Sequence, residues 1–528
     1  MKTRLLRIAI FCTITGLSFF SCTVSNKGVL SIIETTDIHG VFLPYDFVEN
    51  KNIDASVASC YTYIKGAREK SEGVVLLDNG DNLQGQPEVY YYNFIDTVSP
   101  HLVAEVMNFM QYDAGTTGNH DIEAGHSVYD RLVKEYNFPL LAANAVDIKT
   151  GKPYFKPYQV ISRNGLRIAV FGMVTPAIPE WLPPELYKGM EFKDMVETAK
   201  KWMPVILREK PDLVVGLFHS GWDKYDDKNR NNSKEENGSS AVAYNVPGFD
   251  IIFNGHDHKL ANEKFVNIAG DTLLVLDGGS HAGKMAEADV RFTGSKKNGK
   301  KNISLSGKII NVSDYKPDPE FVTKFRHYQD TISNYVRRVI GYSKEDISSR
   351  ESYFGPSAFV GLIHSLQLEI TGADVSFAAP LSFDVKIAKG PVTVGDMFKL
   401  YRFENMLYTL QMSGDEIRKY LEYSYSGWLN TMHDACDRLL KLRADKSGRL
   451  SMSNGKAWLK NQPYNFDSAA GIDYTVDVSK PEGERVVITG FSDGRAFDMN
   501  KIYKVALNSY RGMGASAAAG ARYGQLFR

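Results

Sequence analysis

The chain has 528 residues, and its 62 Lys and Arg balance its 62 Asp and Glu, so the formal net charge is zero. This balance excludes the large basic surplus that favours a nucleic-acid polymer or an anionic membrane surface as partner. Single hydrophobic cores stop growing at roughly 250 to 300 residues, so we expect two domains. We also expect a monomer whose substrate binds through local clusters of side chains.

The N-terminal segment differs in composition from the rest. Basic residues at positions 2, 4 and 7 accompany an apolar run over residues 5–20 that stops at Ser21-Cys22, which is typical of a signal peptide and not of a membrane-spanning helix. A Cys after a small residue at the cleavage point resembles a bacterial lipobox and predicts a lipid on Cys22; ordinary cleavage is the alternative. We therefore expect an exported protein of the bacterial cell envelope that faces the periplasm or cell surface.

In the first half of the chain, short apolar runs with strand character lead into polar loops rich in His, Asp, Asn and Gly. The strands are predicted at 29–33, 74–77, 213–218 and 251–253. Ligands bind at the carboxyl ends of strands in open α/β sheets, so we expect the loops to meet at one rim. The loops read Asp37-Ile38-His39-Gly40, Gly80-Asp81-Asn82, Thr117-Gly118-Asn119-His120-Asp121, His219-Ser220-Gly221 and Gly255-His256-Asp257-His258.

Three further segments complete the first half. Residues 228–240 are polar with Gly and Asn and predict an exposed surface loop. Residues 296–301 predict a basic turn between two strands. Pro317 and Pro319 open a helical pattern over 320–339, with apolar side chains at three- and four-residue steps, and this helix is the predicted joint between the domains.

The second half predicts its own compact core. A helix is predicted at 358–370, a strand at 373–377, and a turn at 412–416 that enters another helix. Two polar loops, 463–467 and 508–512, each present aromatic side chains. The predicted boundaries are a signal segment at 1–22, a first domain at 28–315, a linking helix at 316–341 and a second domain at 342–528.

The cysteines predict no disulfide. Of the four, Cys12 leaves with the signal peptide and Cys22 takes the lipid. Cys60 and Cys436 then remain, in different predicted domains, and we expect two buried free thiols.

The polar loops supply a candidate metal set that contains no thiolate. Carboxylate, amide and imidazole ligands suit two divalent ions such as Mn, Zn or Fe and argue against a Cys-based zinc site. A single His at a strand end is usually hydrogen-bonded to its own loop, so the hypothesis depends on all the loops together. We assign Asp37, His39, His258 and Asp81 to one ion, and Asn119, His219, His256 and Asp81 to the other, with Asp81 as the bridge between ions roughly 3.5 to 4 Å apart.

In their order, these motifs resemble those of the calcineurin-like metallophosphoesterases, and more narrowly the bacterial secreted 5'-nucleotidase and 2',3'-cyclic-nucleotide 2'-phosphodiesterase (3'-nucleotidase) family. Residues 390–422 and the loops at Tyr464 and Asn508 resemble that family's C-terminal nucleotide-binding domain. The resemblance implies an α/β fold, with an N-terminal calcineurin-like sandwich and a separate α/β domain that grips the nucleoside and swings relative to the metals.

The resemblance also implies a mechanism, in-line attack on phosphorus by a hydroxide that bridges the two ions. Asn119 then holds a phosphate oxygen as well as a metal, while His120 stabilises the transition state or protonates the leaving group. The family orients this His with an acid three positions later. That acid is Glu123 here, where 5'-nucleotidases typically have Asp; Asp121 is an alternative partner, and both acids could instead be solvated.

Two aromatic side chains sandwich the base in this family. The matching positions are Tyr464 and Tyr510, with Phe466 a rival for the first, although aromatics in loops also often cover the edge of a core. The chain ends in an Ala- and Gly-rich tail soon after Gly514, so we expect the second aromatic loop to be less firmly supported than in the family.

The substrate position is indicated by two segments. The 5'-nucleotidase branch carries a Gly-rich, Arg-containing segment where this chain reads Ala378-Ala379-Pro380-Leu381. That segment and residues 174–181 are more similar to the cyclic phosphodiesterase branch. We expect hydrolysis of 2',3'-cyclic nucleotides to 3'-nucleotides, followed by removal of the 3'-phosphate. A 5'-nucleotidase and a catalytically silent nucleotide-binding lipoprotein are the alternatives.

Overall fold

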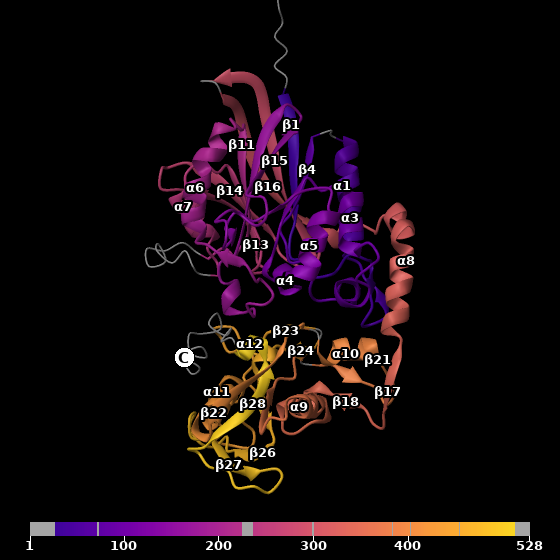
Figure 1. Cartoon of the computed structure of the whole chain (residues 1–528), viewed down its shortest axis with the longest axis vertical. Helices are drawn as coiled ribbons and strands as arrows, with labels where there is room; N and C mark the ends of the chain where they lie inside the picture. The colour runs from indigo at the N-terminus through magenta and orange to yellow at the C-terminus, as the bar shows by residue number, and fades with distance from the viewer. Residues whose placement is uncertain are drawn as a thin grey trace, which may run out of the picture.

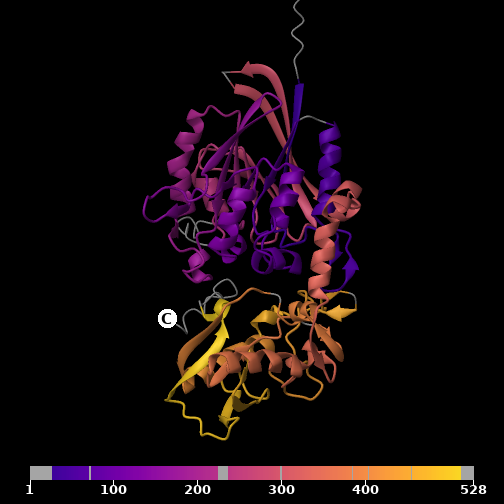
Figure 2. The ribbon, with the colours of Figure 1, turned by 45° about the vertical axis from the view of Figure 1, so that its right-hand side comes forward.

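The computed structural model describes residues 27–70, 73–223, 236–297, 300–382, 384–401, 403–453 and 455–512. Figure 1 shows two bodies stacked along the long axis, with helix α8 (Pro319–Val336) along one side of the first body and pointing toward the second. In the turned view of Figure 2, α8 again runs along the first body toward the second. The predicted α/β organisation in two separate parts is confirmed.

The first body contains two six-stranded sheets that pack face to face. The first sheet has the order β16 (Lys300–Asn311), β15 (Lys284–Lys297), β1 (Lys27–Thr35), β4 (Val74–Asp78), β5 (Ala114–Thr116), β6 (Leu140–Leu141). The second has the order β13 (Leu260–Val266), β14 (Thr272–Gly278), β12 (Ile251–Asn254), β11 (Leu213–His219), β9 (Leu166–Val174), β8 (Tyr158–Arg163). The four strands expected from the sequence are thus confirmed as β1, β4, β11 and β12.

The central strands of each sheet run parallel, so their carboxyl ends meet at one rim. Strands β1, β4, β5 and β6 are parallel in the first sheet, and β9, β11, β12 and β14 are parallel in the second. The strands are nearly continuous apolar runs because both faces are covered. The apolar core between the sheets includes Leu30 and Val75 from one sheet and Val215 and Phe253 from the other.

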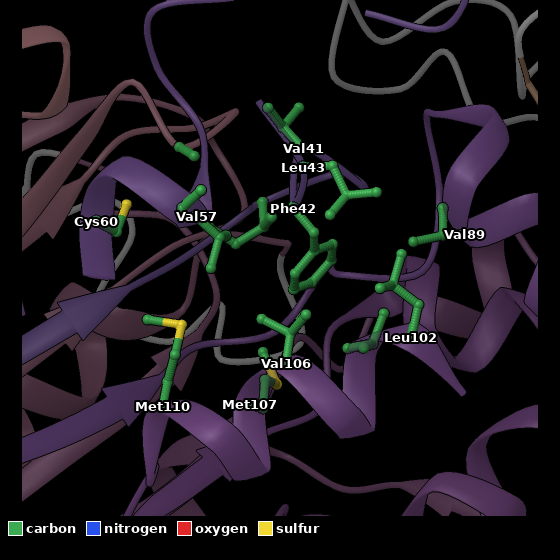
Figure 3. Close-up of a cluster of buried hydrophobic side chains, with 14 of the residues drawn as sticks. Val41, Phe42, Leu43, Val57, Cys60, Val89, Leu102, Val106, Met107 and Met110 are labelled. Atoms are coloured by element: carbon green, nitrogen blue, oxygen red, sulfur yellow. The ribbon is translucent and has the colours of Figure 1, made fainter. Parts of the chain in front are cut away.

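Helices cover the two outer faces of this sandwich. One face is covered by α1 (Val57–Lys70), α3 (Leu102–Met110) and α8, and the other by α6 (Met195–Arg208) and α7 (Ser239–Asn245). Short helices α2 (Pro87–Tyr90), α4 (Asn119–Glu123) and α5 (His126–Glu135) follow strands of the first sheet. Figure 3 shows the first of these outer cores, where Phe42 lies among Leu43, Val57, Leu102 and Val106.

Helix α8 packs on the first body and ends earlier than the sequence predicts. Its buried side chains Phe321, Phe325, Tyr328, Ile332 and Val336 join the core beneath α1 and α3. The predicted extension to residue 339 is wrong, because Val339 already begins strand β17 (Val339–Ser343), which pairs with β21 (Gly390–Thr393) of the second body.

The second body has a four-stranded sheet with its own core. The order is β22 (Leu407–Ser413), β28 (Ile502–Asn508), β19 (Val375–Ala378), β25 (Ser468–Ala470). Helices α9 (Ala358–Thr371), α10 (Val394–Leu400) and α11 (Gly414–Trp428) accompany it, with the ribbon β26 (Ile472–Val476) and β27 (Val486–Phe491). The helix predicted at 358–370 is confirmed, and Ser413 caps α11 by accepting the N–H of Glu416.

The bodies contact each other next to the joint. The Tyr90 ring of α2 meets the Phe398 ring of α10 edge to face at 5.3 Å, and Arg337 donates to Asn50 at 2.9 Å. A cavity of about 550 Å³ remains between them, lined by these two rings, by Tyr335 and by residues 401 and 403–405.

Other sequence-based expectations have mixed outcomes. Of the basic turn predicted at 296–301, the described residues belong to the paired strands β15 and β16, and residues 298 and 299 lie outside the described part. The segment 228–240 is described only from residue 236, and there the predicted exposure is wrong, because Ser239 and Ser240 are buried at the start of α7.

The two thiols also differ. Cys60 is buried among apolar side chains, and burial raises the pKa of its thiol to about 12. Cys436 is exposed, so the predicted burial of this thiol is wrong. Among the described residues, no helix has both the length and the apolar character needed to span a bilayer.

Candidate metal centre

All seven candidate ligands lie on loops at the same rim of the sandwich. Asp37 and His39 follow β1, Asp81 follows β4, Asn119 begins α4 after β5, His219 ends β11, and His256 and His258 follow β12. Both sheets therefore contribute. Figure 1 shows that α4 lies at the end of the first body that faces the second.

The backbone at this rim is strained. Five candidate ligands have left-handed φ angles, which non-glycine residues rarely adopt: Asp37 (49°), His39 (49°), Asp81 (57°), His256 (78°) and His258 (58°). Such conformations cost on the order of 1 to 3 kcal/mol each and persist where neighbouring contacts enforce them. Here the loops hold one another, since Asp37 N–H donates to Gly80 at 2.9 Å and His39 N–H to Asp81 O at 2.9 Å.

The first cluster joins Asp37, His39 and His258. The Nε2 atoms of the two histidines lie 3.0 Å apart, and Asp37 Oδ1 lies 3.4 Å from His258 Nε2 and 4.0 Å from His39 Nε2. Ligands bound at roughly 2.0 to 2.2 Å around one ion lie about 3 to 3.5 Å from one another, so this spacing fits a single ion. His39 is oriented by its Nδ1, which lies 3.2 Å from the carbonyl oxygen of Gln84.

The second cluster joins Asp81, Asn119, His219 and His256. Asn119 Oδ1 lies 3.1 Å from His219 Nε2 and 2.8 Å from His256 Nδ1, and Asp81 Oδ2 lies 3.1 Å from His219 Nε2. The His219 ring is fixed by its Nδ1, 2.6 Å from the carbonyl oxygen of Asn79. This spacing also fits one ion, and carboxylate, amide and imidazole donors suit Mn, Zn or Fe.

The charges of the two clusters fit a cation at each. Burial opposes ionisation of Asp37, but the hydrogen bond of His258 and the charges of His219 and His258 together outweigh it and lower the Asp37 pKa to about 2. Burial likewise opposes ionisation of Asp81, yet the neighbouring histidines, His219 first among them, together hold its pKa well below the usual range. Two ionised carboxylates in a buried site need positive countercharge, which divalent ions can supply.

Asp121 organises the loops and does not contact His120. Its two carboxylate oxygens accept the N–H groups of Gly118 (2.8 Å), Asp81 (2.9 Å), Asn82 (2.8 Å) and Leu83 (3.1 Å). These bonds tie the loop after β4 to the start of α4. The alternative that Asp121 orients His120 therefore has no support in the structure.

His120 instead pairs with Glu123. Its Nδ1 lies 2.5 Å from Glu123 Oε2, one turn along α4, and its N–H donates to Asp81 Oδ1 at 2.8 Å. Burial would lower the pKa of the ring, but the charges of Asp81 and Glu123 outweigh it and raise the pKa to about 9. The longer Glu side chain thus reaches the histidine in place of the Asp expected from the resemblance.

Comparison with known proteins identifies both parts. Residues 30–260 match the model of the calcineurin-like phosphoesterase family, and residues 339–520 match the C-terminal domain of 5'-nucleotidases. The chain combines these two domains. The chain is 27% identical to a 2',3'-cyclic-nucleotide 2'-phosphodiesterase/3'-nucleotidase of Yersinia enterocolitica, over 91% of this chain and 80% of that protein.

Two other comparisons agree with this result. The chain is 27% identical to a 5'-nucleotidase of Vibrio cholerae, over 74% of this chain and 75% of that protein. The crystal structure of a 5'-nucleotidase precursor from Thermus thermophilus shares the fold, with a TM-score of 0.62 at 20% identity, over 95% of this chain and 96% of that one. The rim described above, with its two clusters that could hold metal ions, therefore lies in a calcineurin-like phosphoesterase domain.

In the 5'-nucleotidase C-terminal domain, the two candidate tyrosines lie together. The rings of Tyr464 and Tyr510 are 6.3 Å apart and nearly perpendicular. Buried Arg511 joins the two loops, because it donates to Asp467 (2.7 Å), to Tyr464 O (2.5 Å) and to Asn465 (3.0 Å). The loop is thus anchored within the described residues, while the tail on which the expectation of weak support depends, residues 513–528, lies outside them.

The structure excludes Phe466 as the rival of Tyr464. Its side chain is 1% exposed and stacks on Trp428 at 5.2 Å, with Tyr353 edge-on at 6.0 Å. A ring enclosed in this way cannot stack on a base without opening the core. The sequence alone does not show which of two aromatic residues, two positions apart in an irregular loop, is buried in the core.

Two side chains at the metal centre escaped the sequence-based prediction. Glu236 Oε1 lies 2.9 Å from His256 Nε2, and the Trp181 ring stacks on the His256 ring at 5.5 Å and 23°. Glu236 lies in the segment predicted to be a surface loop, where a carboxylate is ordinary and does not indicate a contact with a metal ligand. Trp181 lies in a segment noted for its family resemblance, but nothing in its spacing indicates contact with His256.

A test of this geometry is Gly118→Ala. An added Cβ would overlap the Asp81 carboxylate and lie 2.5 Å from Asp81 N, so Asp81 must move. We expect at least about tenfold weaker Mn²⁺ affinity by calorimetry on chelator-treated protein, and a loss of about 1 to 3 kcal/mol in stability. Gly66→Ala in α1, where an added Cβ meets nothing within 4 Å, is the matched control. Wild-type affinity in Gly118→Ala would contradict the assignment.

Proposed function

We propose that the chain is a dimetal phosphohydrolase that opens 2',3'-cyclic nucleotides and then removes the 3'-phosphate. The observation that supports this most directly is the position of Asp81 between the two clusters. Its carbonyl oxygen accepts the N–H of His39 in the first cluster at 2.9 Å, and its Oδ2 lies 3.1 Å from His219 in the second. A shared carboxylate of this kind is what two ions need in order to act on one phosphate.

The residues around this carboxylate would have different roles in the reaction. Two divalent ions held by the seven ligands would polarise the phosphate and lower the pKa of water. Asn119 uses its Oδ1 toward His219 and His256, which leaves its amide nitrogen to donate to a phosphate oxygen. His120 has Nδ1 engaged by Glu123, so Nε2 is the atom that donates a proton to the departing sugar oxygen.

Glu123 makes this proton transfer effective by two means. Its carboxylate fixes the orientation of the His120 ring at 2.5 Å, and its negative charge favours the imidazolium form that carries the proton. The His120 side chain is 32% exposed, so one edge of the ring remains free to face a substrate. A pure nucleotide-binding protein has no use for this pair, which disfavours the silent lipoprotein.

The 2',3'-cyclic and 3' position is favoured over the 5' position by two observations. The similarity to the Yersinia enterocolitica protein extends over 91% of this chain, against 74% for the Vibrio cholerae 5'-nucleotidase. Ala378 ends β19, and Ala379 and Leu381 after it are also buried and apolar, so this segment brings no cation where the resemblance implies an Arg in the 5'-nucleotidase branch. A 5'-nucleotidase is the second candidate.

The nucleoside would be held by Tyr464 and Tyr510 across from the metals. Stacking on aromatic rings tolerates any nucleobase, so this site favours a broad substrate range. Since Arg511 ties the Tyr464 loop to the Tyr510 loop, both rings would be presented as one unit.

For location we propose export and a lipid anchor on Cys22, which rests on the sequence of residues 1–22 alone. These residues lie outside the described part of the structure. Such a protein would act on nucleotides outside the cytoplasm.

The substrate prediction is tested by phosphate release from 2',3'-cyclic AMP, 3'-AMP and 5'-AMP with Mn²⁺. We expect release from the first two, and a kcat reduced about 10²- to 10⁴-fold in His120→Ala with Mn²⁺ affinity retained. His126→Ala is the matched control, because His126 has the same exposure and also pairs with a carboxylate, Asp130, on the following helix α5.

Three results would contradict parts of this prediction. Release from 5'-AMP alone would favour the 5'-nucleotidase. Activity that survives removal of the metals by a chelator would exclude the dimetal mechanism. Nucleoside binding without turnover in Mn²⁺ would favour the silent lipoprotein.

Removal of one stacking ring should weaken substrate binding more than chemistry. We expect Tyr510→Ala to raise KM roughly 5- to 150-fold, since stacking contributes about 1 to 3 kcal/mol per base, while Tyr510→Phe keeps a near-normal KM. Tyr342→Ala, at an exposed tyrosine of β17, serves as control. An unchanged KM in Tyr510→Ala would show that this ring covers the core edge.

The lipid anchor is tested by Cys22→Ser in a bacterial host. We expect the variant to leave the membrane fraction and to lose incorporation of labelled fatty acid, because the thiol is the acylated group. A variant that still fractionates with membranes would indicate ordinary cleavage and another mode of attachment.

A further inference from the structure

We propose that Glu236 is a positioning residue for the second metal, because it holds His256 from the side opposite to the ion. The inference rests on the proposed dimetal centre but not on the identity of the substrate. It concerns a side chain that supplies no ligand atom to either cluster.

The two ring nitrogens of His256 have different partners. Nδ1 points into the second cluster, 2.8 Å from Asn119 Oδ1, while Nε2 points outward, 2.9 Å from Glu236 Oε1. A carboxylate only accepts hydrogen bonds, so it selects the tautomer with the proton on Nε2 and leaves the Nδ1 lone pair for the ion. It also makes the imidazole a stronger donor to a metal than a neutral acceptor would.

His256 needs this support more than the neighbouring histidines do. His39 and His219 are oriented by main-chain carbonyls, those of Gln84 and Asn79, on loops of the first sheet. His256 instead has a side-chain partner in place of a carbonyl, so its orientation depends on that side chain. The Trp181 ring covers its face at 5.5 Å and 23°, so the ring is fixed at one edge and on one face.

The main chain of Glu236 is anchored independently of its side chain. The Glu236 carbonyl accepts the Ser220 hydroxyl at 2.8 Å, and the same hydroxyl accepts the N–H of Gly238 at 2.8 Å. Ser220 follows His219, so the segment that carries Glu236 is fixed beside one ligand of the second ion while its carboxylate reaches another. A substitution of the carboxylate therefore leaves this anchor in place.

The test is a calorimetric titration of the chelator-treated, full-length protein with Mn²⁺ in wild type, Glu236→Gln and Glu236→Asp. We expect one of the two sites in Glu236→Gln to bind about 10- to 100-fold more weakly while the other keeps its affinity. Glu236→Asp should recover part of the loss. Glu180→Gln is the matched control, since Glu180 is an exposed carboxylate next to Trp181, and it should leave both sites unchanged.

Trp181 gives a second readout of the same site. Its emission should change on Mn²⁺ binding in wild type and only at higher Mn²⁺ in Glu236→Gln. The change should be smaller in Trp181→Phe, in which Trp222 remains near the site with its main-chain N–H donating to Asp257 at 3.3 Å. The proposal would be overturned if Glu236→Gln bound Mn²⁺ at both sites with wild-type affinity. It would also be overturned if both sites were weakened equally and the variant had a lower melting temperature than wild type in the presence of chelator. A wild type that binds no divalent ion would instead overturn the dimetal centre itself.

Discussion

The burial of two ionised carboxylates at the rim is the constraint on which the rest of the site depends. Asp37 and Asp81 are almost fully enclosed, and hydrogen bonds and positive charge from neighbouring histidines lower both of their pKa values. Enclosing an unpaired carboxylate costs several kcal/mol, so the surrounding loops must provide compensation. The left-handed backbone conformations of the ligand loops, together with Gly118 and Gly255, place the carboxylates where two cations can provide this compensation.

The second body completes this arrangement from the other side. Glu404 lines the cavity between the bodies, where burial and the charge of Glu123 raise its pKa well above the usual range and the charge of His120 lowers it. The His120–Glu123 pair therefore lies where the two bodies face each other. In this position it can meet a phosphate held by the first body and a nucleoside held by the second.

The sequence was sufficient for the parts of the structure that depend on local pattern. The strands that precede Asp37, Asp81, His219 and His256 are apolar runs, and parallel pairing then brings their ends together without further information. Glu123 was predicted from the family resemblance, which places an acid three positions after His120, and helix α4 brings the two side chains together. The structure favours Glu123 over Asp121, because the Asp121 carboxylate already accepts the main-chain N–H groups of four other residues.

The features that sequence missed depend on long-range contacts. Helix α8 ends at Val336 because β17 pairs with β21, some fifty residues away, and no local signal marks that end. Phe466 and Tyr464 are two positions apart, yet the stack on Trp428 assigns one to the core. Glu236 lies in a polar stretch, and nothing in the sequence indicates that its carboxylate contacts His256; only the three-dimensional structure shows this contact.

The packing of α8 has a consequence for how the molecule can be divided. The helix lies between the two family matches, yet Phe321, Phe325 and Ile332 belong to the core of the first body. A fragment cut before Pro319 would uncover the apolar surface of α1 and α3, whereas one cut after Val336 would keep that core whole. The phosphoesterase domain therefore includes helix α8, and the link to the 5'-nucleotidase C-terminal domain is confined to the few residues between Val336 and Val339.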